Sequence, residues 1–170
     1  MRWLWIDRIV ELVPHQRLVA IKNVSLSEEH LLSTADGTPV MPASLIIEGM
    51  AQSAGLLVGH AGGFREKVLL AKIQRATFNS DATPGTTLRY TATLARFDPQ
   101  GAATTGTVDL IDPTTGNSTH LGDVSLLFTH LDQNASGEVF GDTNFVFGEG
   151  FRTLLRLSGL ECPDAGTPTQ

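Results

Sequence analysis

One carboxylate, that of Glu48, lies inside a long apolar stretch at residues 43–60, ASLIIEGMAQSAGLLVGH. Burying a carboxylate is costly unless the group is paired or has a chemical task. Gln52 follows one helical turn later, where its amide can hydrogen bond to the carboxylate. Two interpretations are open: an acid or base for proton transfer, or a carboxylate neutralised by Gln52.

Hydroxyl groups gather around the start of this stretch, on Ser33, Thr34 and Ser44. Such residues often cap helices and stabilise turns. Together with a nearby carboxylate they can also position a water molecule for hydrolysis. The residues alone support both interpretations.

Other kinds of site are disfavoured by composition. The five histidines are scattered without metal-ligand spacing, and there is a single cysteine, so we expect no metal and no cofactor. The net charge is −6 and there is no run of basic residues, which argues against nucleic acid as a partner. No apolar stretch is long enough to span a bilayer, and Asp7, Arg8 and Glu11 interrupt the N-terminal one. We therefore expect a cytoplasmic protein.

The apolar stretch at residues 43–60 predicts the element that positions Glu48. Its apolar residues cover nearly the whole circumference of a helix, which is typical of a buried helix. Pro42 suits the N-terminus of that helix, because its missing N–H costs nothing there. Residues 27–42 before it are polar and predict a loop.

The remaining elements are mostly strands. Residues 3–13 predict an N-terminal helix or turn, and residues 145–160 predict a closing amphipathic helix. Strands are predicted at residues 17–26, 67–79, 86–97, 102–111 and 118–131. Long strands with short turns form an antiparallel meander. We therefore expect an α+β fold in one domain, residues 1–160, with the sheet wrapped around the buried helix and a disordered tail at 161–170.

The loop and helix together resemble the β-hydroxyacyl-(acyl carrier protein) dehydratases of fatty-acid synthesis, which have the hotdog fold. The family motif HFPGxPVMPG precedes a helix of the type VLIIEAMAQ. Residues 37–42, GTPVMP, match the loop, and residues 45–52, LIIEGMAQ, match the helix. The segments IDRIVEL, VAIKNVS and VLLAKIQRATF and the turn at Pro84-Gly85 extend the resemblance over residues 3–97.

The chain departs from the family motif at its catalytic position. Thr34, Ala35 and Asp36 replace HFP, so Thr34 stands where the family has its histidine. A threonine hydroxyl has no basic site near neutral pH, whereas imidazole titrates there. The resemblance therefore implies impaired dehydratase activity, unless His30 or Asp36 supplies the missing base.

The resemblance also assigns roles to the other site residues. In the family, the histidine and the helix carboxylate come from opposite subunits and face each other across a tunnel. Glu48 would act on the departing hydroxyl, and the backbone N–H of Ala43 would hold the thioester carbonyl. Further residues placed beside the substrate are Gly37, Met41, Pro42, Ser44 and Gln52.

The resemblance implies a thioester of acyl carrier protein or coenzyme A as partner, and a homodimer or a trimer of dimers. Pairing of sheet edges is a common route to such dimers. Basic residues that would meet an acidic carrier, or simply form surface charge, are Arg65, Lys67, Lys72, Arg75 and Arg89. Two other functions stay open: a thioesterase that uses Glu48, Ala43 and Gln52 or Ser53, and the non-catalytic subunit of a heterodimer whose partner supplies the histidine.

Overall fold

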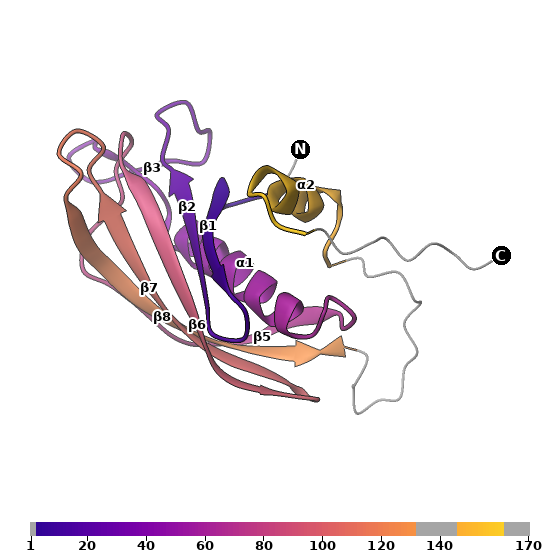
Figure 1. The fold of residues 1–170 in the computed structure, drawn as a ribbon. Helices are drawn as coiled ribbons and strands as arrows, with labels where there is room; N and C mark the ends of the chain where they lie inside the picture. Colours follow the sequence, from indigo (N-terminus) through magenta and orange to yellow (C-terminus); the bar gives the residue numbers. More distant parts are fainter. Residues whose placement is uncertain (1–2, 132–145, 162–170) are drawn as a thin grey trace.

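The computed structural model describes residues 3–131 and 146–161. Six antiparallel strands form one curved sheet, with helix α1 (Ala43–Ala61) lying along one face (Figure 1). The strands are β1 (Arg8–Val13), β2 (Arg17–Asn23), β5 (Val68–Phe78), β6 (Thr87–Asp98), β7 (Gly101–Ile111) and β8 (Ser118–His130). Their order across the sheet is β1-β2-β6-β7-β8-β5. The predicted α+β arrangement of a sheet around a buried helix is confirmed.

The meander predicted over residues 67–131 is confirmed for β6, β7 and β8, but β5 pairs with β8 and not with β6, the next strand in sequence. β6 pairs with β7, β7 with β8, and β8 with β5, all antiparallel and in long registers. Short turns suffice for β6–β7–β8 because antiparallel neighbours need no crossover connection. β5 precedes the other three strands in sequence, but it pairs only with β8 and so forms an edge of the sheet.

The prediction of a helix or turn at residues 3–13 is wrong, because residues 8–13 form strand β1. β1 pairs antiparallel with β2, and Ile9 is buried in the core. Pro14 lies in the tight turn between the strands, where His15 adopts a φ of 58°. The β-branched and alternating residues RIVELV gain a partner only when β2 is beside them, and this pairing decides the local structure.

The loop predicted at residues 27–42 contains a small hairpin, formed by β3 (Leu32–Ser33) and β4 (Pro39–Val40). Leu32 pairs with Val40, and Ser33 pairs with Pro39. Met41 then bridges to Ala82, with its N–H donating to the Ala82 carbonyl at 2.8 Å. This hairpin carries Thr34 at its tip and delivers the chain to the start of α1.

Helix α1 is buried along most of its length, as predicted. Gly49 shows how closely it approaches the sheet, because a Cβ atom there would lie 2.5 Å from Cζ of Tyr90. Any larger residue at position 49 would clash with the fully buried tyrosine ring on β6. This close approach sets the distance between α1 and the sheet, and with it how far Glu48 is buried.

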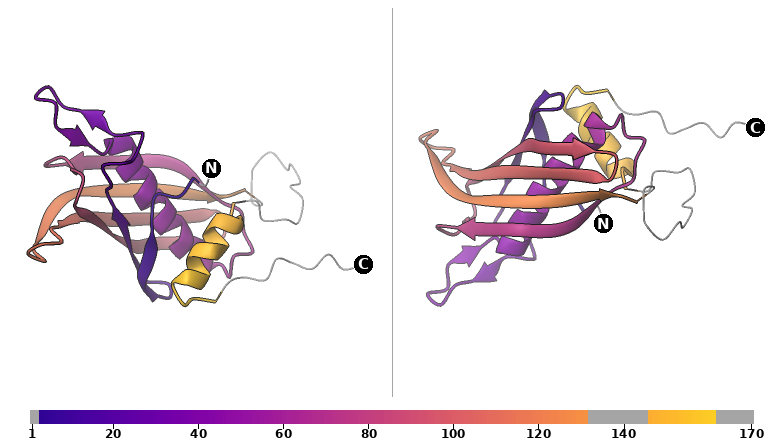
Figure 2. Two further views of the ribbon diagram at one scale, coloured as in Figure 1. Left: turned by 90° about the horizontal axis from the view of Figure 1, so that it is seen from above. Right: turned by 90° about the horizontal axis from the view of Figure 1, so that it is seen from below.

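A second helix, α2 (Glu149–Leu157), lies near the C-terminal end of α1 (Figure 2). It falls within the helix predicted at residues 145–160, of which residue 145 lies outside the described residues. Leu154 and Leu155 are buried, and the Ile9 N–H of β1 donates to Ser158 Oγ at 3.0 Å just after the helix. The tail predicted as disordered lies, from residue 162 onward, outside the described residues.

Within the described ranges, neither helix has the length and hydropathy required to cross a membrane.

Candidate functional site

Glu48 lies in the second turn of α1 and is half-buried. Its Oε1 accepts a hydrogen bond from Nε2 of Gln52 at 2.9 Å, as the spacing predicted. Among the described residues, no hydrogen bond to the second carboxylate oxygen is found. One oxygen is thus fixed and the other is available to a ligand or a water molecule.

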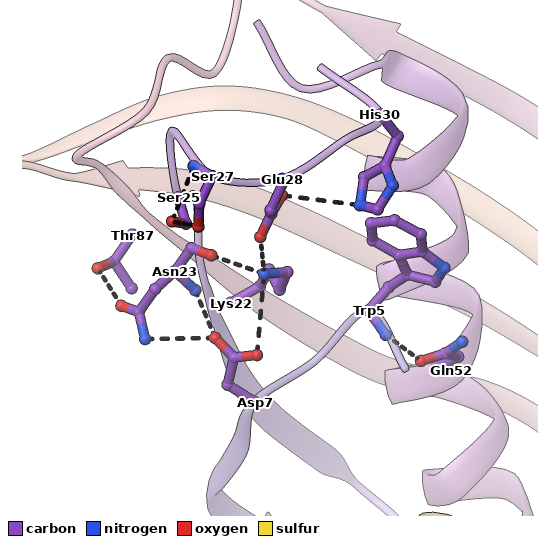
Figure 3. Close-up of polar contacts among 10 residues, drawn as sticks. All are labelled: Trp5, Asp7, Lys22, Asn23, Ser25, Ser27, Glu28, His30, Gln52 and Thr87. Atoms are coloured by element: carbon purple, nitrogen blue, oxygen red, sulfur yellow. Dashed lines mark hydrogen bonds and ion pairs between the residues drawn. The ribbon is translucent and has the colours of Figure 1, made fainter. Parts of the chain in front are cut away.

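Gln52 links Glu48 to the N-terminal segment. Its Oε1 accepts the Trp5 N–H at 2.8 Å (Figure 3), and its Nε2 also donates to the Trp3 carbonyl at 3.2 Å. Gln52 is buried, and its amide uses both of its polar atoms in these bonds. It therefore positions the carboxylate and anchors the segment before β1 to the helix.

Glu48 is the only charged residue among the described residues that line an apolar cavity of about 220 Å³. The α1 face of this cavity runs over successive turns from Glu48 to Leu56. Two strands and the segment before and within α2 complete the wall, through Val68, Leu69, Leu70, Phe128, Val146, Phe147 and Phe151. An apolar chain with a polar head at Glu48 matches the chemistry of this lining.

The start of α1 offers backbone donors. Ala43 and Ser44 are exposed, and the Pro42 N-cap has no side-chain hydrogen bond to the first turn within the described part of the chain. The first N–H groups of a helix have no intrahelical acceptors, and the helix dipole favours negative charge there. These N–H groups can hold a carbonyl oxygen, in line with the role that the resemblance gives to Ala43. The capping role suggested for Ser44 is not found in α1.

Met41 differs from the other residues expected beside a substrate. It is 2% exposed and belongs to the hydrophobic core. Its backbone N–H is used by Ala82. Met41 therefore fixes the path of the chain into α1, and it lines neither of the two cavities described here.

Thr34 is held in the tip of the β3–β4 hairpin by its own neighbours. Its backbone N–H donates to the Thr38 carbonyl at 2.9 Å, and its carbonyl accepts the Gly37 N–H at 3.0 Å. Its hydroxyl donates to the Asp36 carboxylate and accepts the Thr38 N–H at 3.1 Å. Gly37 adopts a φ of 85°, which closes this turn.

These bonds weaken Asp36 as a base. The hydroxyl of Thr34 and the N–H of Thr38 stabilise the carboxylate and lower the pKa of Asp36 to about 2. A carboxylate with so low a pKa is a poor proton acceptor near neutral pH. Thr34 and Asp36 line a second cavity that shares no residue with the cavity of Glu48. Within one chain, therefore, Thr34 and Glu48 do not face the same cavity.

His30 is held by a polar network at the base of the hairpin (Figure 3). Its ring meets Trp5 edge-on with centroids 4.6 Å apart, and its Nε2 lies 4.0 Å from Oε2 of Glu28. Glu28 in turn pairs with the buried Nζ of Lys22 at 2.5 Å. His30 therefore packs on the N-terminal segment, and among the described residues no hydrogen bond joins it to Thr34.

The ion pair between the buried Lys22 and the half-buried Glu28 was not predicted. Lys22 is 8% exposed, and its Nζ also donates to the Asn23 carbonyl at 2.6 Å and lies 3.8 Å from Oδ1 of Asp7. The pair ties the loop that leads to Thr34 onto β2. The available signal was a lysine directly after the apolar run LVAI in the strand sequence RLVAIKN.

The basic residues proposed for a carrier have different surroundings. Lys67 is buried at 4% exposure, so it is not a surface group of this chain. Arg89 pairs with Asp109 at 2.9 Å on the sheet. Arg65, Lys72 and Arg75 are exposed. Within residues 3–131 and 146–161, no group of three or more His, Cys, Asp or Glu could hold a metal ion.

Comparison with known proteins identifies the family. A family model described as a FabA-like domain matches residues 1–111, and the chain belongs to this family. The chain is 42% identical over 90 residues to the 3-hydroxyacyl-[acyl-carrier-protein] dehydratase FabZ of Acidiphilium cryptum, covering 51% of this chain and 54% of that protein. It is 43% identical over 89 residues to FabZ of Solibacter usitatus, with the same coverage. The chain thus spans about half the length of the curated relatives it matches.

Solved structures share the fold. An acyl-CoA hydrolase from Staphylococcus aureus has a TM-score of 0.57 at 14% identity, covering 72% of this chain and 68% of that one. A thioesterase family protein from Silicibacter pomeroyi has a TM-score of 0.60 at 15% identity, covering 73% and 83%. At such identities the likeness shows the fold alone. The hotdog fold expected from the sequence is confirmed.

Proposed function

We propose that this protein binds acyl thioesters in fatty-acid metabolism and that its 3-hydroxyacyl dehydratase activity is impaired. The observation that carries the proposal is the contrast within the site: Glu48 borders an apolar cavity, whereas Thr34 has the position of the family histidine. The names of the FabZ relatives support a thioester substrate.

Dehydration of a 3-hydroxyacyl thioester needs two proton transfers. A base removes the proton from the carbon next to the carbonyl, and an acid protonates the hydroxyl that leaves as water. Glu48 can serve the leaving hydroxyl. Thr34 cannot act as the base near neutral pH, and Asp36 is a weak one because its pKa is about 2. Loss of a general base lowers rates by about 10²–10⁴-fold.

A complete site requires a second chain in this proposal. Thr34 and Glu48 of one chain line separate cavities, and β5 is an edge strand of 11 residues. Leu70 and Ile73 on β5 are exposed at 40% and 45%, which suits pairing with a second β5. We expect a homodimer, or a trimer of dimers, in which Thr34 of one chain approaches Glu48 of the partner. A solution mass equal to one chain would contradict it.

The decisive experiment follows two products from one substrate. Purified protein is given a 3-hydroxyacyl thioester of pantetheine, the arm shared by coenzyme A and acyl carrier protein. Formation of the unsaturated thioester reports dehydration, and free thiol reports hydrolysis. We expect binding with little dehydration. Rapid dehydration by the unmodified protein would overturn the proposed impairment.

A thioesterase is the second candidate, favoured by the free oxygen of Glu48 beside an apolar cavity. Attack of water on a thioester needs a base and an oxyanion site, and it does not need the missing histidine. Glu48 would activate the water and the first-turn N–H groups of α1 would hold the oxyanion. Thiol release in the same assay identifies this activity. Binding without either product would favour the non-catalytic subunit of a heterodimer.

A further inference from the structure

The cavity beside Glu48 has a wall that the matched family region does not supply. Val146, Phe147 and Phe151 belong to the segment that leads into and begins α2, beyond residues 1–111. The rest of the lining comes from α1, β5 and β8. Residues beyond the matched region therefore help decide how much space the cavity offers.

Phe147 packs against α1 at a point further along the helix than the cavity. Glu48, Gln52, Gly55 and Gly59 follow at spacings of three or four residues, so they lie along one face of α1. A Cβ atom at Gly59 would lie 2.4 Å from Cζ of Phe147. The ring thus occupies the space that a side chain at Gly59 would fill, and it blocks this face of α1. Gly59 follows Glu48 by 11 residues, which places the block about 16 Å from Glu48 along the helix axis.

The aromatic wall is firmly supported. The ring of Phe147 is 4.9 Å from Phe64 and 6.2 Å from Phe151, both edge-on. Phe147 is 4% exposed, whereas Phe151 is only half-buried. The buried Leu154 and Leu155 and the Ser158 hydroxyl hold α2 beside β1. The wall is therefore a fixed surface rather than a loose side chain.

We propose that Phe147 and Phe151 set the maximum length of the acyl chain, and that the preferred ligands are acyl thioesters whose chain has an uncharged end. This inference rests on the proposed function. Phe147 and Phe151 both line this cavity of about 220 Å³. Beyond Glu48 and Gln52 its lining is apolar, so a terminal carboxylate on the acyl chain would be buried without a partner.

The test uses acyl pantetheine thioesters from butyryl to hexadecanoyl, with binding measured by calorimetry. In the unmodified protein, affinity should rise with each methylene, by about fourfold, and then stop rising once the chain reaches the aromatic wall. Phe151→Ala should move this limit to longer chains, and Phe151→Trp should move it to shorter ones. Phe97→Ala, which removes a ring outside the cavity lining, is the matched control and should leave the limit unchanged.

The outcomes separate this inference from the proposed function. Thermal unfolding of each variant confirms that it is folded, and Phe151→Trp tests the limit even where Phe151→Ala does not fold. If the unmodified protein binds thioesters but the limit is the same in the folded Phe151 variants, the inference is overturned and the proposed function stands. If the unmodified protein binds no acyl thioester of any length, both are overturned. Equal affinity for an acyl chain with a terminal carboxylate would contradict the apolar end.

Discussion

The polar groups of the α1 face and those of the β3–β4 hairpin differ in how fully they are hydrogen bonded within the chain. On α1, one carboxylate oxygen of Glu48 accepts a hydrogen bond from Gln52, and the side chain borders an apolar cavity. In the hairpin, the groups of Thr34 and Asp36 bond to each other and to Thr38. The difference is that α1 leaves one oxygen of Glu48 available to a ligand, whereas the polar groups of the β3–β4 hairpin stabilise the hairpin itself.

The largest effect is expected from restoring a base to the hairpin. Thr34→His should raise dehydration of a 3-hydroxyacyl thioester by about 10²-fold or more, because a general base contributes about 10²–10⁴-fold. The measurement is the rate of unsaturated thioester formation. Thr34→Ala is the control, since it breaks the bond to Asp36 without adding an imidazole. Equal rates for the histidine and alanine variants would show that the hairpin does not present the residue to the substrate.

The next effect tests the helix half. Glu48→Gln keeps the size of the side chain and removes its proton chemistry, so it should lower any dehydration or thiol release by about 10²-fold. Acyl thioester affinity should stay nearly unchanged. The exposed Glu29→Gln removes a charge elsewhere and serves as the matched control. Unaltered hydrolysis in the Glu48→Gln protein would exclude the thioesterase and point to another site.

A smaller effect concerns stability of the α1 half. Gln52→Ala removes the acceptor of the buried Trp5 N–H and the donor to Glu48. An unsatisfied buried group costs about 1–3 kcal/mol, so the free energy of unfolding should fall by that amount. Denaturant unfolding measures it, with the exposed Gln16→Ala as the control. A loss no greater than that of Gln16→Ala would contradict the anchoring role.

The smallest effect is a pH dependence of the hairpin. The folded pKa of Asp36 is about 2, below its ordinary value of 3.8, so the bonds to its carboxylate stabilise the fold above pH 4. That contribution should disappear as the pH falls from about 4 to about 2. An NMR titration should place the Asp36 midpoint near 2, and Thr34→Val should move it up toward 3.8. The same midpoint in both proteins would show that Thr34 is not the cause.

Much of the scaffold could be predicted from sequence. Helix α1 and strands β2, β5, β6, β7 and β8 appear where the apolar patterns, glycines and prolines indicate them. These signals are local, since each depends on neighbours within one or two turns of chain. The hydrogen bond between Gln52 and Glu48 is local in the same sense, and its prediction is confirmed.

The arrangement of the candidate site was decided by tertiary contacts. β1 is a strand only because β2 lies beside it. Gln52 finds Trp5 47 residues away, and Phe147 reaches Gly59 from the far end of the chain. No local sequence pattern predicts these contacts, because they depend on packing between segments that are distant in the chain. The sequence by itself therefore determined which residues are candidates for the chemistry, and the fold decided which of them share a cavity.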